Sequence, residues 1–516
     1  MHPTIHAANM PDKPAYIMAG SGAVVTYGQL NDRTNQCAQL FRSLGVQAGD
    51  HIAILMENDV RFLEVCWAAQ RSGLIFTAIS THLSHEEAAY ILDNCDAILL
   101  VASQLMAGLA SAACARTPRV KHRLMVNGDV AGFVSYETSR GEQPARPIVD
   151  ECAGIDMLYS SGTTGRPKGV TVEFDPKDIT SIQPALRGLI KMFNFTADTV
   201  YLSTAPLYHA APLRFNMMTM FQGGTAIIME KFDAATALEL VRDYRITHSQ
   251  WVPIMFSRML ALADSVRQQA DVRSMQCAIH AAAPCPVAVK QAMIDWWGPI
   301  VYEYYGSTEA IGISVITPLE WLTHKGSVGR AIVGKARIVD EQTGEELPIG
   351  QIGTLYFSDG PGVKYHKDPE KTASIRNSKG WISVGDIGYL DQEGYIYLTD
   401  RQAFMIISGG VNIYPQETEH VLMSHPKVAD VAVIGVPNQE FGEEVKAVIQ
   451  LREPRDACDS LAGELIRFCR ERISHIKCPR SIDFMEMLPR LDNGKLYKQK
   501  LKERYGSQVS PPRAHT

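Results

Sequence analysis

The sequence "YSSGTTGRPKGV", residues 159–170, brings glycines, small hydroxyl side chains and two cations together in one short stretch. Glycine lets the backbone turn tightly and aim its amide groups at an anion. The serine and threonine hydroxyls add hydrogen-bond donors, and Arg166 and Lys168 add positive charge. We therefore predict a phosphate-binding loop made of Ser160, Ser161, Gly162, Thr163, Thr164, Gly165 and Lys168.

A Walker-type loop is excluded by spacing and by context. That loop reads G-x-x-x-x-G-K-[ST] and opens a helix, whose first amide groups hold the phosphates. Here Lys168 follows a proline and precedes Gly169, and the next residues, "VTVEF" (170–174), have the composition of a strand. The alternative to a phosphate site is a solvated surface turn, which does not require this run of hydroxyls and glycines.

Length and composition indicate a multidomain globular protein. The chain has 516 residues, which predicts about three structural units at roughly 150 residues each. Its net charge is −6, so no overall positive field attracts nucleic acid. We therefore expect small-molecule partners rather than nucleic acid, and the sequence indicates no particular oligomeric state.

The cysteines and the N-terminus indicate a cytoplasmic protein. The ten cysteines form no C-x-x-C pair and no zinc-type spacing, which is typical of reduced thiols. Residues 1–14 lack the basic and apolar regions of a signal peptide. The uncharged segment 97–115 is rich in alanine, and we predict a strand at 97–101 followed by an internal helix rather than a membrane span.

The order of hydrophobic patterns predicts an α/β fold. Over the first 300 residues, short apolar runs alternate with helical periodicity, which predicts mainly parallel sheets covered by helices. After about residue 325, period-two alternation predicts antiparallel hairpins in a small β-barrel-like part. Beyond residue 401 the pattern predicts a small mixed α+β unit. We therefore predict a large N-terminal domain, 1–401, and a small mobile C-terminal domain, 402–516.

The opening stretch resembles the signature loop of the adenylate-forming superfamily: acyl-CoA synthetases, firefly-type luciferases and peptide-synthetase adenylation domains. Six further motifs resemble those of this superfamily and occur in the same order. The motif sequences are most similar to those of bacterial fatty-acid and steroid-acid CoA ligases. The six motifs are "PLYHAAPL" (206–213), "HAAAPCP" (280–286), "YEYYGSTE" (302–309), "WISVGDIGYLDQEGYIYLTDR" (381–401), "ISGGVNIYPQETE" (407–419) and "LPRLDNGKLYKQKL" (488–501).

The resemblance implies a role for each matching residue at the reacting centre. Lys495 supplies the cation for adenylation, and Thr308 donates to the α-phosphate. Glu309 is the expected Mg²⁺ ligand, since magnesium needs only one or two carboxylates beside phosphate and water. His209 is expected to border the acid pocket, although a histidine beside apolar residues can also serve packing alone.

The resemblance also assigns nucleotide and coenzyme contacts. Asp386 is expected to accept hydrogen bonds from the ribose hydroxyls, and Tyr305 offers a flat face for adenine. The remaining expected contacts are Ala282 and Ala283 along adenine, Arg401 on ribose and phosphate, and Ser408, Gly409 and Gly410 on coenzyme A.

Three positions depart from the superfamily pattern. No histidine follows the phosphate loop in "VTVEFDPKD" (170–178). The interdomain pivot reads "RQAFMI" (401–406), with Ala403 and Phe404 in place of polar residues. Ile476 stands where a tyrosine is common. None of these removes a group with an expected chemical role.

The predicted function is that of an ATP-dependent acyl-CoA synthetase, an acid–thiol ligase that uses ATP, Mg²⁺ and coenzyme A. The apolar and aromatic segments around the expected pocket suggest a hydrophobic acid: fatty, steroid side-chain or aryl. Two alternatives remain open. One is an adenylation enzyme that loads a separate carrier protein, and the other is a non-catalytic nucleotide-binding relative.

Overall fold

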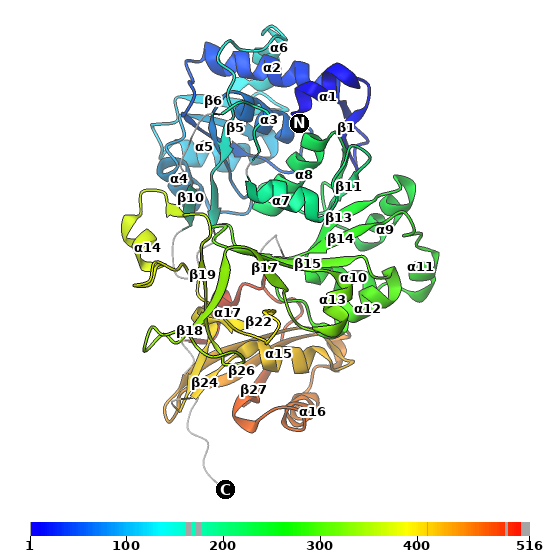
Figure 1. Ribbon diagram of the computed structural model, residues 1–516, viewed down its shortest axis with the longest axis vertical. Helices are drawn as coiled ribbons and strands as arrows, with labels where there is room; N and C mark the ends of the chain where they lie inside the picture. The colour runs from blue at the N-terminus through cyan, green and yellow to red at the C-terminus, as the bar shows by residue number, and fades with distance from the viewer. Residues whose placement is uncertain are drawn as a thin grey trace.

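The computed structural model describes residues 2–160, 167–171, 177–182, 184–409, 411–490 and 494–506. Figure 1 shows most of the chain in an upper body, blue to yellow, and a smaller orange-to-red part below it. Helix α15 of the lower part lies beside strand β22 of the upper part, where the two meet.

The N-terminal region forms a six-stranded parallel sheet. Its strands, in sheet order, are β7 (Val134–Ser135), β6 (His122–Val126), β5 (Leu99–Ser103), β3 (His51–Leu55), β4 (Ile75–Ala78) and β8 (Ile155–Asp156). Its helices are α1 (Pro3–Asn9), α2 (Tyr27–Ser43), α3 (Phe62–Arg71), α4 (His85–Asn94), 3-10 helix η1 (Gln104–Met106), α5 (Ala107–Cys114) and α6 (Tyr136–Gly141). Capping boxes begin α2 and α4, as "TYGQ" and "SHEE" allow.

A nine-stranded mixed sheet forms the centre of the upper body. In sheet order it contains β17 (Arg330–Val333), β16 (Ile313–Ile316), β15 (Val301–Gly306), β14 (Cys277–His280), β13 (His248–Trp251), β11 (Val200–Ser203), β12 (Thr225–Ile228), β1 (Pro14–Met18) and β2 (Val24–Thr26). The strands from β15 to β1 run parallel, and both edges end in antiparallel pairs. Its helices are α7 (Pro184–Met192), α8 (Ala210–Gln222), α9 (Ala234–Asp243), α10 (Pro253–Leu260), α11 (Asp264–Gln269), α12 (Val287–Trp297) and α13 (Pro318–Thr323).

Two small antiparallel sheets complete the upper body. One contains β20 (Lys364–Tyr365), β10 (Lys168–Thr171) and β9 (Leu158–Ser160), with α14 (Pro369–Ser374) nearby. The other contains β18 (Lys335–Val339), β19 (Gly353–Ser358), β21 (Asp386–Leu390) and β22 (Ile396–Arg401). The antiparallel prediction is confirmed, but among the described residues this second sheet is open rather than a closed barrel.

The C-terminal part is a mixed five-stranded sheet with helices. Its strands are β24 (Val411–Ile413), β23 (Ile406–Ser408), β26 (Gly442–Leu451), β25 (Val428–Asn438) and β27 (Ser481–Phe484), the last parallel to β26. Its α-helices are α15 (Pro415–Met423), α16 (Asp459–Arg470) and α17 (Lys498–Gly506), with 3-10 turns η2 (Gln402–Phe404), η3 (Pro454–Asp456) and η4 (His475–Lys477). The predicted α/β fold is therefore observed, with strands and helices where the periodicity changes.

The uncharged segment 97–115 contains a strand followed by a helix, as predicted, although β5 spans Leu99–Ser103 rather than the predicted 97–101. Strand β5 is entirely buried, and α5 buries Ala110, Ala113 and Cys114. Among the described residues, no helix has the length and apolarity needed to cross a membrane.

Candidate active site

The residues on either side of the predicted phosphate loop belong to two paired antiparallel strands. Strands β9 and β10 pair so that Lys168 lies opposite Ser160. Ser160 and Lys168 therefore mark the two ends of the segment that joins these strands. The other predicted loop residues, Ser161, Gly162, Thr163, Thr164 and Gly165, lie outside the described residues.

Lys168 and Glu309 converge on Tyr365. The hydroxyl of Tyr365 donates to Oε1 of Glu309 across 2.9 Å, and Nζ of Lys168 lies 5.8 Å from the centre of the Tyr365 ring. Burial and the nearby Lys371 lower the pKa of Lys168. Thr308 precedes Glu309 just after strand β15, in a half-buried position. The hairpin, strand β20 and the end of β15 thus bring a cation and a carboxylate to one place.

Tyr305 and Asp386 are in direct contact. The Tyr305 hydroxyl donates to Oδ2 of Asp386 across 2.5 Å, although the two residues are distant in sequence. Asp386 is 4% exposed at the start of β21, and its backbone pairs with Arg401 on β22. The structure therefore brings together the predicted adenine and ribose residues, and it places the backbone of Arg401 beside them.

The turn after strand β14 has an unusual backbone. Ala282 has φ of 74°, a left-handed conformation that is uncommon for a residue with a Cβ atom. Ala282 is exposed and Ala283 is half-buried. Strained backbone of this kind concentrates at functional sites, which is consistent with the predicted position along adenine.

His209 is the N-cap residue of helix α8. Its ring lies 4.6 Å from that of Tyr208, and among the described residues its Nε2 atom has no hydrogen-bond partner. Burial, Lys495 and His82 lower the pKa of His209 to about 3. The imidazole is therefore neutral at physiological pH, and Lys495 lies close enough to influence it.

The C-terminal segment that carries Lys495 docks on the upper body. A Cβ atom placed on Gly494 would lie 2.8 Å from Cγ2 of Val252 and 3.0 Å from Cγ2 of Ile254, at the start of α10. Arg490 holds this segment, since its guanidinium donates to the carbonyl of Gly494 across 2.5 Å and pairs with Asp430 at 2.6 Å. Lys495 thereby reaches the region of His209.

The predicted coenzyme A residues are in a different part of the structure. Ser408 ends β23 and is 5% exposed, and the amide of Gly409 donates to the carbonyl of Phe441 across 2.8 Å. Gly410 lies outside the described residues. Among the described residues, no recorded contact joins Ser408 or Gly409 to His209 or Asp386.

Sequence reasoning assigned no role to several residues that contact the site segments. Tyr365, Arg490 and Asn58 contact site segments from distant positions in the chain. Lys498 is another such residue, since it is 6% exposed and pairs with Glu419 at 2.7 Å. Only its position three residues after Lys495 in the same motif could have drawn attention to it.

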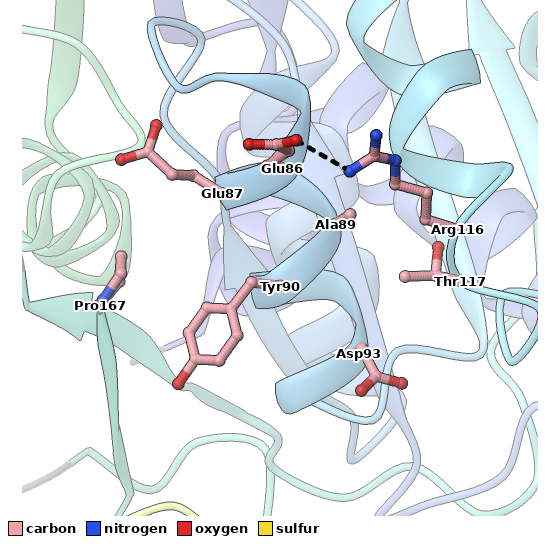
Figure 2. A pocket seen from close by; sticks show the side chains of 8 residues that line it. All are labelled: Glu86, Glu87, Ala89, Tyr90, Asp93, Arg116, Thr117 and Pro167. Carbon is pink, nitrogen blue, oxygen red and sulfur yellow. Dashed lines mark hydrogen bonds and ion pairs between the residues drawn. The ribbon is translucent and has the colours of Figure 1, made fainter. Parts of the chain in front are cut away.

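A cavity of about 410 Å³ lies beside Pro167, next to the hairpin. Figure 2 shows that α4 contributes most of its wall, including Glu86, Glu87 and Asp93, and that Glu86 pairs with Arg116. Three carboxylates on one wall would repel a polyphosphate. This cavity is therefore an unsuitable nucleotide site, despite its position.

Two family models match the chain. The family model described as AMP-binding enzyme matches residues 4–364, and that of the AMP-binding enzyme C-terminal domain matches residues 417–495. The chain belongs to the AMP-binding enzyme family.

Its curated relatives include several CoA ligases. A crotonobetaine/carnitine–CoA ligase of Escherichia coli is 30% identical, with 95% of this chain and 96% of the relative covered. The long-chain-fatty-acid–CoA ligase FadD13 of Mycobacterium tuberculosis is 29% identical, with 97% of each covered. A feruloyl-CoA synthase of Amycolatopsis is 31% identical, with 94% of this chain and 95% of the relative covered.

Solved structures show the same fold. ATP-bound MatB from Rhodopseudomonas palustris superposes with a TM-score of 0.81 and 26% identity, with 98% of this chain and 99% of that chain covered. A fatty acyl CoA synthetase of Mycobacterium tuberculosis gives a TM-score of 0.73 and 27% identity, with 98% of each chain covered.

Proposed function

We propose that the chain is an ATP-dependent acyl-CoA synthetase, which joins a hydrophobic carboxylic acid to coenzyme A through an acyl-adenylate. The observation that carries this proposal is the approach of Lys495 to His209, because it brings a cation from the C-terminal part to the edge of the expected acid pocket. The CoA-ligase relatives support the same activity.

In the first half-reaction, the acid's carboxylate attacks the α-phosphorus of ATP and pyrophosphate leaves. Lys495 stabilises the negative charge that develops, and Lys168 with the phosphate loop holds the leaving phosphates. Asp386 binds the ribose, while Tyr305 orients Asp386 through its hydroxyl. Neutral His209 borders the carboxylate without adding a second charge. Catalysis then rests mainly on position and charge, since no side chain forms a covalent bond.

In the second half-reaction, the thiol of coenzyme A attacks the acyl carbon and AMP leaves. Lys495 has no role in this step, whereas Ser408, Gly409 and Gly410 are proposed to contact the coenzyme. Because these residues lie apart from His209 here, the proposal requires the C-terminal domain to rotate between the steps. Residues 1–401 and 402–516 are the proposed rigid units, and each of the six hydrophobic clusters of described residues lies wholly within one of them.

The carboxylate of Glu309 offers the oxygen ligands that a magnesium ion prefers. Its carboxylate accepts one hydrogen bond from Tyr365 and retains further lone pairs. Among the described residues, no group of three or more His, Cys, Asp or Glu side chains is placed to hold a metal. Glu309 would therefore hold Mg²⁺ together with nucleotide phosphates and water, and the ion would neutralise phosphate charge.

A cytoplasmic location remains part of the proposal. All ten cysteines are free thiols, and seven of them are buried. Free thiols are usual in a reducing compartment.

The direct test is pyrophosphate release from ATP with a panel of acids, measured with and without coenzyme A. We expect acid-dependent release together with a CoA thioester product. Release without any thioester product would favour an enzyme that loads a carrier protein. No release with any fatty, steroid side-chain or aryl acid would favour a non-catalytic nucleotide-binding relative.

A further inference from the structure

A second cavity, of about 90 Å³, lies between helix α8 and the six-stranded sheet. Its walls are mainly apolar and include Trp67, Phe76 and Met217. The polar side chains in these walls are Gln70, Ser181 and one ion pair, formed by Arg214 of α8 and Asp156 of β8. A charged pair in an apolar cavity requires an explanation, since it keeps polar atoms among groups that cannot satisfy them.

The protein does not use every hydrogen-bonding atom of this ion pair. Nε and Nη2 of Arg214 both donate to the same oxygen, Oδ2 of Asp156, across 3.1 and 2.7 Å. Within the described part of the chain, no hydrogen bond is recorded to Nη1 of Arg214 or to Oδ1 of Asp156. The Arg214 side chain is 25% exposed and that of Asp156 is 11% exposed. The cavity therefore presents one donor nitrogen and one acceptor oxygen.

Helix α8 connects this cavity to the proposed reacting centre. Ala210, Ala211, Arg214 and Met217 are half-buried, whereas the residues between them are buried. Spacings of three and four residues place these side chains on one face of the helix. The accessible face begins next to His209 and reaches Met217 after eight residues, a rise of about 12 Å.

A second polar side chain lies beside Arg214. Tyr304 of β15 interacts electrostatically with Arg214, and its hydroxyl accepts a hydrogen bond from Nε2 of Gln250 across 3.2 Å. Tyr304 is half-buried. The accessible face of α8 is thus polar at the end far from His209. The segments that are expected to build the acid pocket are largely apolar in sequence.

We propose that the Arg214–Asp156 pair recognises an uncharged oxygen function, a hydroxyl or carbonyl, at the distal end of the carboxylic acid. The inference rests on the proposed function and specifies its substrate class. A hydroxyl can accept from Nη1 of Arg214 and donate to Oδ1 of Asp156. Because the pair carries no net charge, it favours a neutral polar group over a second carboxylate or an ammonium group. The distance along α8 places this oxygen about 8–12 Å from the reacting carboxylate.

The experiment compares matched acids that differ only in the distal oxygen. The pairs are 8-hydroxyoctanoic and octanoic acid, and 3-(4-hydroxyphenyl)propionic and 3-phenylpropionic acid. The readout is the ratio of kcat/KM values, from pyrophosphate release, for the oxygenated and plain members. In the wild-type enzyme we expect a ratio above about 10 for at least one pair, since hydrogen bonds to charged groups are worth roughly 10- to 100-fold.

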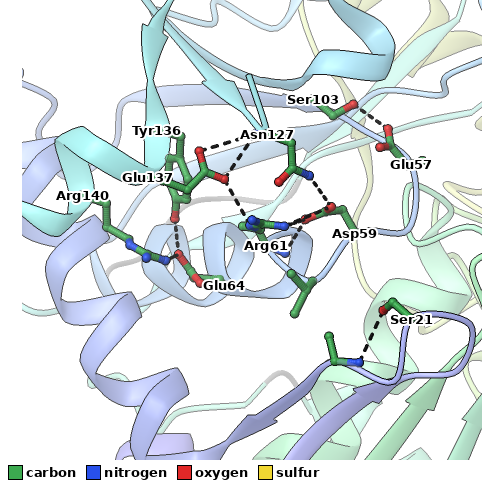
Figure 3. Close-up of polar contacts among 12 residues, drawn as sticks. Ser21, Glu57, Asp59, Arg61, Glu64, Ser103, Asn127, Tyr136, Glu137 and Arg140 are labelled. Atoms are coloured by element: carbon green, nitrogen blue, oxygen red, sulfur yellow. Dashed lines mark hydrogen bonds and ion pairs between the residues drawn. The ribbon is translucent and has the colours of Figure 1, made fainter. Parts of the chain in front are cut away.

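Arg214→Met should bring this ratio to about 1 or below, mainly by lowering kcat/KM for the oxygenated acid. Arg140→Met is the matched control. Arg140, on helix α6, also forms an ion pair, and its partner is Glu64 in the network that Figure 3 shows. The control variant should leave the ratio unchanged even if it lowers Tm. Asp156→Asn keeps the shape of the pair and should reduce the ratio for hydroxyl acids, which need an acceptor.

The outcomes separate the inference from the proposed function. If no acid supports pyrophosphate release, the proposed function is wrong. If acids are activated but the wild-type ratio is near 1 for both pairs, or Arg214→Met changes both members equally, the pair only joins α8 to the sheet and the inference is wrong. If Arg214→Met does not fold, the ratio with Asp156→Asn decides in the same way.

Discussion

The backbone N–H of Leu207 donates to Oδ1 of Asn58 across 2.8 Å. Nδ2 of Asn58 donates to the carbonyl of Met229 across 2.8 Å and to that of Ala205 across 3.3 Å. Asn58 is 7% exposed, and it follows β3 of the six-stranded sheet. One side chain therefore fixes the segment that leads directly to His209, across the boundary between two sheets.

Replacing Asn58 with alanine should lower kcat/KM by about 10- to 100-fold, because small displacements of positioning groups are costly to catalysis. The buried amide and carbonyl left unpaired should also lower stability by about 1–3 kcal/mol. Steady-state kinetics at a temperature where the variant is fully folded separates the two effects. Exposed Asn9→Ala is the control and should change neither quantity measurably. Normal kcat/KM in a folded Asn58→Ala protein would show that the segment needs no such anchor.

Gly494→Ala should impair adenylation selectively. Gly494 has φ of 77°, and a Cβ atom there would lie 2.8 Å from Cγ2 of Val252. The alanine therefore opposes the docking that brings Lys495 to the site. We expect a loss of at least about 10-fold in acyl-adenylate formation, approaching the 10²–10³-fold expected for Lys495→Ala.

Thioester formation from supplied acyl-adenylate should stay near the wild-type rate in both variants, because that step does not use Lys495. Gly463→Ala in helix α16 is the control, since its added methyl group meets only the tip of Arg467 at 3.8 Å. Equal losses in the two half-reactions for Gly494→Ala would assign this segment a structural role instead.

Much of the fold was predictable because the signals are local. The change from short apolar runs to helical periodicity located β5 and α5, and turn clusters located the hairpins. Among the described residues the barrel-like part is an open antiparallel sheet. The alternating pattern predicts that strands are present, but it does not predict how the edge strands pair. Closure depends on contacts that the local pattern does not encode.

The candidate site was predictable only where residues sit in motifs. The Tyr305–Asp386 contact joins two motif residues, so both were identified, though the hydrogen bond between them was not. Tyr365 bonds Glu309 from 56 positions away, and Asn58 bonds Leu207 from 149 positions away. Such partners follow from the tertiary fold, and nothing in their neighbouring sequence marks them.

His209 should remain neutral through the physiological range. Burial, Lys495 and His82 lower the pKa of His209 to about 3 from the ordinary value of 6.5. Because the folded pKa is the lower one, the unfolded state binds the proton more readily. The stability that His209 contributes is complete above pH 6.5 and is lost as pH falls toward 3.

Titration of the His209 ring by NMR tests this, with the signal assigned through His209→Gln. Lys495→Met removes a nearby cation and should raise the pKa of His209. His2 is an internal control, because burial and Arg71 lower its pKa to about 3, and it should not respond to Lys495→Met. An unchanged His209 pKa in Lys495→Met would mean that the two residues are apart in solution.

The pivot between the domains should lie at Ala403. This residue is exposed in turn η2, and its carbonyl accepts from Nζ of Lys502 across 3.3 Å. Nearby, Oδ2 of Asp400 accepts from the amide of Gln416 across 3.0 Å, which joins the end of β22 to α15. The Asp400–Gln416 hydrogen bond crosses the proposed boundary, and it holds the orientation in which Lys495 reaches His209. A rotation for the thioester step must break this bond and change the backbone between Asp400 and Gln416.

Ala403→Pro should therefore preserve adenylation and impair thioester formation. Proline fixes φ near −65°, which a 3-10 turn already adopts, so the observed orientation is compatible with it. The same restriction opposes a change of φ at the pivot. We expect acyl-adenylate to form at close to the wild-type rate in a rapid-quench experiment, and its consumption by coenzyme A to slow by at least about 10-fold. The Ala403→Gly variant leaves the backbone free to rotate at this position and should carry out both half-reactions at normal rates. If the Ala403→Pro variant carries out both half-reactions at wild-type rates, the pivot lies elsewhere and the proposed boundary between residues 401 and 402 is misplaced.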